Sequence, residues 1–329
     1  MVCPPDLPAC SEKTVAPAGA EALHGLVAGQ IAAACNWPDD QRDGLLQAIR
    51  QRFGAGVQAI LIYGSYLRGK RDTLLDFYVL LEDYAAMRSP WQAALAWMLP
   101  PNVYQVRYAS PPQESRAKFA LMTLDRFEYA LQHDFHSYFW ARFAQPSGLL
   151  YCRDETVRQR LVAAIGQAAS TFVRRVVPRL PDRFDAADLI RYGLSLTYQC
   201  ELRSEPPDHV QALYGHNEAY YQAMVAALAS AGLGYRAANH ADGYRNETSP
   251  GARRLAAIIW RLRRLYGKLL SVLRLLKAIL TFAGGFDYLL WKIGRHSKDI
   301  IEPTPRQRKY PLIFAWPLLW RLYRRGAFR

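Results

Sequence analysis

The chain has 329 residues and a formal net charge of +14, with 51% hydrophobic and 21% charged residues. This length allows two domains with cores of their own, and the hydrophobic content excludes a disordered chain. The five cysteines are scattered without paired spacing. They therefore argue against a disulfide framework or a zinc site and fit a reducing compartment.

Positive charge is concentrated near the end of the chain. Residues 251–329 hold 18 Lys and Arg against three Asp and Glu, whereas residues 1–250 hold 24 against 25. A basic segment of this kind favours an anionic partner, either a nucleic acid or an acidic membrane surface.

The first forty residues carry no recognisable targeting signal. Residues 1–18 are rich in proline, and the apolar stretch near residues 26–35 is short and has no basic leader. Neither a secretory signal nor a transit peptide has this pattern, so we expect a cytoplasmic protein. Helical spacing of apolar residues predicts two helices, over residues 19–35 and 40–53.

Two runs of branched and aromatic residues, VQAILIY at 57–63 and LLDFYVLL at 74–81, predict buried strands joined by a polar, basic connection. Side chains alternate between the two faces of a strand, so Asp76, Tyr78 and Leu80 should share one face. A carboxylate in an otherwise apolar strand needs a partner or a function.

Gly64 and Ser65 close the first of these strands. A small-residue turn lets backbone N–H groups approach phosphate oxygens, and a carboxylate on the next strand can hold the Mg²⁺ that the phosphates also bind. Polymerase-beta-like nucleotidyltransferases combine Gly-Ser with Asp-x-Asp about ten residues later. Here Asp76 is present, but Tyr78 replaces the second Asp. A plain turn is the alternative interpretation of Gly64 and Ser65.

Further elements follow from periodicity and from capping residues. We predict a helix over 91–98, strands over 103–108 and 118–123, and a polar loop over 110–115. Helices are then predicted over 154–177, 185–203 and 208–231, with a loop over 232–251. His133 and His136, three apart on a predicted helix, lack a third ligand, and we interpret them as structural.

The basic segment has the pattern of amphipathic helices. Its first predicted helix places five apolar residues on one face: Leu255, Ile258, Ile259, Leu262 and Tyr266. In a second helix, Arg274 and Lys277 interrupt the apolar run, so neither helix should cross a bilayer. The tail, YPLIFAWPLLWRLYRRGAFR, places aromatic residues beside arginines. We expect residues 251–329 to lie on an anionic membrane surface. Packing of these faces against the protein is the alternative, and nucleic-acid binding fits the Leu, Ile and Trp content less well.

Several stretches, in order along the chain, resemble one family. IYGSYLR with LLDFYVLLED, AKFALMT at 117–123, YFWARFAQP at 138–146, LSLTYQCELR at 194–203, ALYGHN at 212–217 and LLSVLRLLKAILTFAGGFDYLLWKI at 269–293 are similar to segments of the mitochondrial-type phosphatidate cytidylyltransferases. These enzymes are the translocator assembly and maintenance family of CDP-diacylglycerol synthases. That family also tends to lack the second Asp of the pair.

The resemblance implies a reaction and a set of site residues. CTP and phosphatidic acid would give CDP-diacylglycerol and pyrophosphate, with Mg²⁺ required. Asp76 and Glu201 would be the catalytic, metal-binding carboxylates, although the family has Asp where this chain has Glu201. Six residues would bind the nucleotide: Tyr63, Gly64, Ser65, Lys118, Arg142 and Arg203.

The resemblance also implies an α+β fold, with a polymerase-beta-like domain at 1–150. A helical domain, with a winged helix as one option, would follow at 151–250, and a membrane-associating region at 251–329. The protein would then be a cytoplasmic enzyme, peripheral on the inner face of the cell membrane. Two alternatives remain open. One is a catalytically degenerate nucleotide-binding or membrane adaptor, and the other is a nucleotidyltransferase acting on RNA.

Overall fold

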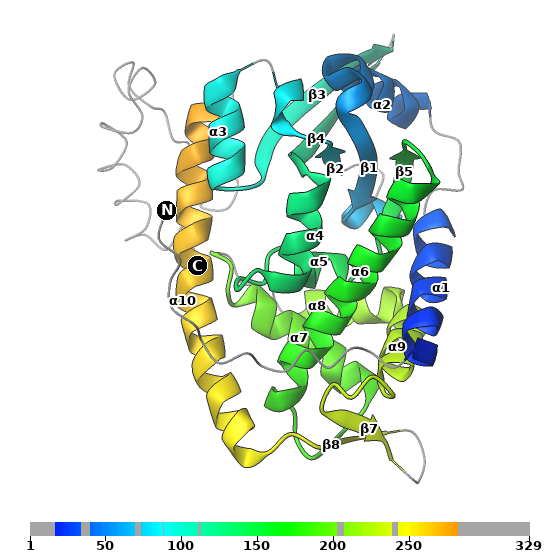
Figure 1. Cartoon of the computed structure of the whole chain (residues 1–329), viewed down its shortest axis with the longest axis vertical. Coiled ribbons are helices and arrows are strands. Elements are labelled where there is room, and N and C mark those ends of the chain that lie inside the picture. The colour runs from blue at the N-terminus through cyan, green and yellow to red at the C-terminus, as the bar shows by residue number, and fades with distance from the viewer. Residues whose placement is uncertain are drawn as a thin grey trace.

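A mixed, five-stranded β-sheet with helices around it forms the fold (Figure 1). The structure is a computed structural model that describes residues 17–33, 40–69, 74–87, 89–110, 113–202, 207–238 and 243–281. The architecture is α+β, as the sequence predicts. The C-terminal tail and Arg203 lie outside the described residues.

The sheet has the order β3-β4-β2-β1-β5. Strands β2 and β4 are parallel, and the other neighbours are antiparallel. The two strands predicted around Gly64 are confirmed, and they pair so that Tyr63 lies opposite Asp76. The strands of this sheet are β1 Val57–Tyr63, β2 Leu75–Leu81, β3 Asn102–Ser110, β4 Gln113–Thr123 and β5 Gly148–Cys152.

Each face of the sheet contributes to a different hydrophobic core. Tyr78 and Leu80 belong to the larger core, together with residues of α1, α4, α6, α7 and α9. Phe77 and Val79 point the other way, into a smaller core with α2. The predicted alternation along β2 is therefore confirmed, and Asp76 lies on the side of the larger core. The helices are α1 Pro17–Ala33, α2 Asp40–Phe53, α3 Pro90–Met98, α4 Leu124–His133, α5 Trp140–Phe143, α6 Glu155–Val176, α7 Ala186–Tyr198, α8 Pro207–His216, α9 Glu218–Leu228 and α10 Pro250–Thr281.

Side-chain caps fix the start of two central helices. Asp154 accepts a hydrogen bond from the backbone N–H of Val157 at the start of α6. Asp185 and Asp188 form a reciprocal capping box at the start of α7. Such caps satisfy N–H groups that have no partner within the helix, which is why these starts were predictable.

Other boundaries differ from the prediction. The segment predicted as a loop at 110–115 is largely strand, because β3 and β4 form a long antiparallel pair that reaches Ser110 and Gln113. The helix predicted to reach residue 203 ends at Tyr198. The helix predicted over 208–231 is two helices that meet at Asn217, two residues after Gly215, and both residues have low helix propensity.

The sequence also missed β-structure. Strand β5 pairs with β1 and was not predicted. The predicted loop at 232–251 contains β7 Tyr235–Ala237 and β8 Tyr244–Asn246, which form a second sheet with β6 Arg183–Phe184. The ring of Phe184 packs against the rings of Tyr235 and Tyr244, with centroid distances of 5.7 and 5.9 Å respectively. Burial of these aromatic rings stabilises the short strands despite the surrounding loop residues.

The basic helix α10 runs along one side of the molecule, from the second sheet toward α3 (Figure 1). It is one helix of 32 residues where two were predicted. Trp260 of α10 packs in the larger core. The same core contains residues from before and after the predicted domain boundary at residue 150. The division into domains at 150 and 250 stays a prediction. In the described part of the chain, no helix combines the length and apolar character needed to span a bilayer.

Candidate functional site

A pocket of about 540 Å³ lies where the ends of β1 and β2 meet helices α1, α5, α7, α8 and α9. This volume is within the range of small-molecule sites, about 300–1,000 Å³. The fold brings six of the eight predicted site residues to its wall, although they come from four separate stretches of the chain. They are Tyr63, Gly64, Ser65, Asp76, Arg142 and Glu201.

Gly64 forms a bend in the wall of the pocket. Its φ of +93° and ψ of −155° are values that side-chain-bearing residues rarely adopt, so glycine is required there. A Cβ atom at Gly64 would lie 3.6 Å from Oδ2 of Asp76. Ser65 follows and opens a short 3-10 helix, Ser65–Arg68. The bend therefore brings the backbone at Gly64 close to the carboxylate of Asp76, and Ser65 adds a hydroxyl group to the pocket lining.

Asp76 has a cation next to it. Lys118 is its register partner on the parallel strand β4, and Nζ of Lys118 lies 3.8 Å from Oδ1 of Asp76. Both side chains are about 30% exposed. Lys118 does not itself line the pocket. It affects the site through its contact with the carboxylate of Asp76.

Arg142 is held in the pocket by three tyrosines. Its Nη1 donates a hydrogen bond of 3.0 Å to the hydroxyl of Tyr78. Its guanidinium lies 4.2 Å from the ring centre of Tyr138 and 4.9 Å from that of Tyr63. Tyr78, which departs from the Asp-x-Asp pattern considered in the sequence, thus positions a cation in this structure.

The electrostatics keep Arg142 charged. Burial acts to lower the pKa of Arg142, but the neighbouring tyrosines and Glu201 raise it well above its ordinary value. Burial also raises the pKa of Tyr63 and Tyr78, so both phenols stay protonated at neutral pH. Arg142 is thus a permanent positive charge fixed in orientation, which suits a phosphate group.

Tyr138 connects the pocket to helix α10. Its ring lies between two guanidinium groups, 4.2 Å from Arg142 and 4.4 Å from Arg274 of α10. Burial acts to raise the pKa of Tyr138, but the charges of Arg142 and Arg274 lower it. Helix α10 therefore contacts the pocket wall at the ring of Tyr138.

Glu201 lies in a turn after α7, where a helix was predicted. Its backbone N–H donates to the carbonyl of Tyr198, 3.0 Å away, as the chain leaves the helix. The side chain lines the pocket, and the charges of Asp76 and Glu201 both raise the pKa of Tyr63. Both carboxylates therefore belong to the wall of the same pocket as Tyr63.

The two carboxylates suit a Mg²⁺ ion that is completed by a ligand. Among the described residues, no three His, Cys, Asp or Glu side chains gather as a protein-only metal site. Mg²⁺ is usually held by one or two carboxylates together with substrate phosphates and water. Asp76 and Glu201 have the number and chemistry that such a site requires.

Sequence reasoning missed the residues on the helical side of the pocket. Arg68, Tyr198, His209, Asn217 and Tyr221 all line it. Arg68 lies in the basic connection between the two predicted strands, and the other four carry no spacing that distinguishes them from core residues. Only the packing of α7, α8 and α9 against the end of the sheet brings them together.

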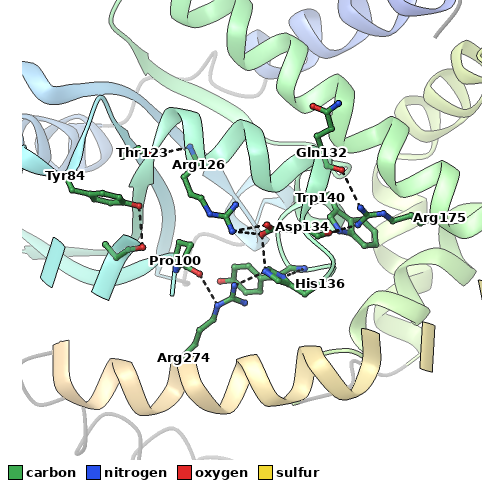
Figure 2. A network of polar contacts seen from close by, with 12 residues as sticks. Tyr84, Pro100, Thr123, Arg126, Gln132, Asp134, His136, Trp140, Arg175 and Arg274 are labelled. Carbon is green, nitrogen blue, oxygen red and sulfur yellow. Dashed lines mark hydrogen bonds and ion pairs between the residues drawn. The ribbon is translucent and has the colours of Figure 1, made fainter. Parts of the chain in front are cut away.

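His136 belongs to a buried ionic network, as the structural interpretation predicted (Figure 2). Arg126 donates two hydrogen bonds to Asp134, at 2.9 and 3.0 Å. Nδ1 of His136 accepts from the backbone of Tyr138, so Nε2 carries the proton and faces Asp134 at 3.1 Å. His136 lies beyond the end of α4, so the prediction of one helix holding both histidines was wrong.

Helix α10 is held beside this network by hydrogen bonds to nearby carbonyl groups. Nη2 of Arg274 lies 3.3 Å from Nε2 of His136, and its Nε donates to the carbonyl of Pro100 (Figure 2). Lys277 donates to the carbonyls of Leu99 and Pro101. Cations therefore hold the inner side of α10.

The outer side of α10 is apolar and exposed. Seven large apolar residues on it are between 41% and 69% exposed. We call them the α10 stripe: Leu255, Ile258, Leu262, Leu265, Tyr266, Leu269 and Leu273. Among the described residues, Tyr266 of the stripe packs against Phe135, with ring centroids 5.8 Å apart, and the leucines and Ile258 of the stripe are exposed.

A scan of the chain against protein-family models gives no match, and a search of curated proteins finds none that is significantly similar.

Proposed function

We propose that this protein is a CTP:phosphatidate cytidylyltransferase, which transfers CMP from CTP to phosphatidic acid and releases pyrophosphate. The observation that carries the proposal is the pocket itself. It collects a glycine-serine bend, a strand carboxylate, a fixed arginine and a second carboxylate from distant parts of the chain. This combination is what a Mg²⁺-bound triphosphate requires.

The residues divide the task by their chemistry. Gly64 and Ser65 offer the triphosphate a close backbone approach and a hydroxyl donor. Arg142, held by Tyr78, neutralises charge on the phosphates. Lys118 offers a second cation through its contact with Asp76, and it is free to turn to a phosphate once a metal ion satisfies that carboxylate.

Asp76 and Glu201 are the residues that would hold Mg²⁺, which would supply charge neutralisation during transfer of the nucleotidyl group. The attacking phosphate of phosphatidic acid is already ionised at neutral pH, so no general base is needed. The protein contributes mainly by positioning the two reactants and by placing cations around the transferring phosphorus. The finer fold assignment, a polymerase-beta-like nucleotidyltransferase domain, is part of this proposal.

Access to a lipid substrate is supported by the α10 stripe. Its leucines are accompanied by the exposed cations Arg254, Arg261 and Lys268 on the same helix. Apolar side chains inserted at the lipid boundary, with cations at the level of anionic headgroups, are typical of helices that lie on membranes. Because Arg274 of this helix contacts Tyr138 in the pocket wall, the membrane contact and the nucleotide site are adjacent.

A nucleotide-binding adaptor without catalysis is the second candidate. The observation in its favour is that Tyr78 replaces a metal-binding carboxylate and is engaged by Arg142. An enzyme acting on RNA would use the same pocket but would not need the exposed apolar stripe.

One assay separates these functions. Purified protein is incubated with labelled CTP, Mg²⁺ and vesicles containing phosphatidic acid, and labelled CDP-diacylglycerol is measured. The proposal predicts lipid-dependent product from the wild type, loss of product in Asp76→Asn, and near-normal product in the control Glu82→Gln. Glu82 is an exposed carboxylate just after β2, outside the pocket. Full turnover by Asp76→Asn would remove that residue from the mechanism, and nucleotide binding without turnover by the wild type would favour the adaptor. Pyrophosphate release that depends on RNA would favour the third function.

A further inference from the structure

Arg68 is a cation in the pocket wall with no part in the proposed mechanism. It is the last residue of the short 3-10 helix Ser65–Arg68, and its side chain is partly exposed. Residues three apart lie on the same side of a 3-10 helix, so Arg68 projects from the same side as Ser65. Both residues line the pocket. The helix therefore presents a serine and an arginine to the same cavity.

The backbone that carries Arg68 is fixed on both sides. Gly64 before the helix and Gly69 after it have φ values of +93° and +82°. The backbone N–H of Gly69 donates a hydrogen bond of 3.1 Å to the carbonyl of Tyr66. The side chain of Tyr66 is 8% exposed and packs in the smaller core. Because a buried side chain anchors the helix, the point from which Arg68 reaches the pocket is set before a ligand binds.

Arg68 differs from Arg142 in its electrostatic surroundings. Glu201 is among the groups that raise the pKa of Arg142. Burial lowers the pKa of Arg68, and the phenols of Tyr198 and Tyr221 act in the opposite direction. Among the described residues, no carboxylate contributes to the pKa of Arg68. A partly buried guanidinium group without a nearby carboxylate favours the binding of an anion.

The charges of the pocket wall lead to the same conclusion. The wall contains the carboxylates of Asp76 and Glu201 and the guanidinium groups of Arg68 and Arg142. A Mg²⁺ ion bound by the two carboxylates would balance their negative charges. A triphosphate carries several negative charges, and Arg142 supplies one positive charge. A second arginine in the same wall can therefore offset a further part of the charge of the triphosphate.

We propose that Arg68 binds the triphosphate of the nucleotide as a second cation, beside the bend at Gly64 and Ser65. This inference rests on the proposed function and adds a phosphate-binding residue to it. The planar guanidinium group can donate two parallel hydrogen bonds to one phosphate group. The phosphate of phosphatidic acid has the same chemistry, so the experiment tests a soluble equivalent of that headgroup separately.

Replacing Arg68 with Gln tests this role, because Gln removes the charge and keeps a polar side chain. Binding of tripolyphosphate, CTP and glycerol 3-phosphate, each with Mg²⁺, is measured by calorimetry on the full chain. We expect Arg68→Gln to weaken tripolyphosphate and CTP binding by about 10- to 100-fold, the value of a hydrogen bond between charged groups, and to leave glycerol 3-phosphate binding unchanged. Arg245→Gln is the matched control, because Arg245 is exposed on β8, lies outside the pocket wall and changes the net charge equally.

Two measurements separate contact with the ligand from a structural role of Arg68. Arg68→Lys keeps the charge, so it should recover part of the affinity that Arg68→Gln loses. Added salt should weaken tripolyphosphate binding less in Arg68→Gln than in the wild type, because salt screens the attraction between the ligand and the arginine. No recovery with Lys, together with an unchanged salt dependence in Arg68→Gln, would assign Arg68 a structural role and refute the inference.

The remaining outcomes separate the inference from the proposed function. Unchanged tripolyphosphate affinity in Arg68→Gln would refute the contact with Arg68, while binding by the wild type would leave the proposed function standing. A loss confined to glycerol 3-phosphate would place Arg68 at the acceptor phosphate and refute its contact with the triphosphate. If the wild type binds neither tripolyphosphate nor CTP, the proposed function fails, and the inference fails with it.

Discussion

Replacing leucines of the α10 stripe should detach the protein from membranes without unfolding it. Leu262, Leu265 and Leu269 are 54%, 69% and 56% exposed. Burying a whole leucine side chain is worth about 1.5–3 kcal/mol. Somewhat over half of each of these side chains is still exposed and could be buried in lipid. The three leucines together should therefore contribute about 3–5 kcal/mol to the free energy of membrane binding. Changing all three to Gln should therefore reduce partitioning into vesicles by roughly two to four orders of magnitude.

The assay is co-flotation with vesicles of phosphatidylcholine and phosphatidic acid. Changing the same three leucines to Met is the matched control, because Met keeps the positions apolar and should leave flotation near the wild-type level. Melting temperatures should change little in both variants, since exposed positions usually contribute within about 0.5 kcal/mol. Flotation of the Gln variant at the wild-type level would refute the role of the stripe. Deleting the helix is a poorer test, because its inner side carries the buried Trp260, Arg263 and Lys277.

Three further predictions concern the pocket and the network beside it. Gly64→Ala forces a side chain into a φ of +93° and should cost about 1–3 kcal/mol of stability, seen as a lower melting temperature; an unchanged melting temperature would contradict the strain argument. Arg142→Lys keeps the charge but loses the planar contacts with Tyr63 and Tyr138, so CTP should bind about tenfold more weakly by calorimetry, whereas equal affinity would show that charge alone suffices. Burial lowers the pKa of His136 below its ordinary value of 6.5, so the unfolded chain takes up a proton first as the pH falls, and stability is lost below about pH 6.5. The melting temperature of the wild type minus that of His136→Gln should therefore be smaller at pH 5.5 than at pH 7.5. A difference that does not change with pH would contradict this prediction.

The sequence was sufficient for elements whose signals are local. Strand β1 ends at Tyr63 because a glycine with positive φ follows it, and α6 and α7 begin at aspartates that cap them. Alternation along β2 placed Asp76 on the correct side of the sheet. For the site, the resemblance to a family supplied Arg142 and Glu201, and the fold then brought them to the same pocket as Asp76.

Features that depend on contacts between distant segments were not predictable. Strand β5 exists because it completes the edge of the sheet beside β1, which no local pattern reveals. The role of Tyr78 depends on Arg142, which lies 64 positions later. Helical periodicity identified the two sides of α10, but it could not tell which side faces the protein. Backbone carbonyls at residues 99–101 accept hydrogen bonds from Arg274 and Lys277, and this turns the cations inward and the leucines outward.

A crystal structure of the protein with CTP and Mg²⁺ tests the central claim most directly. The account predicts that the triphosphate lies beside the bend at Gly64 and Ser65, within hydrogen-bond distance of Arg142, with the metal ion bound to Asp76. A triphosphate bound at any other place on the molecule, or a metal ion held without Asp76, would contradict it.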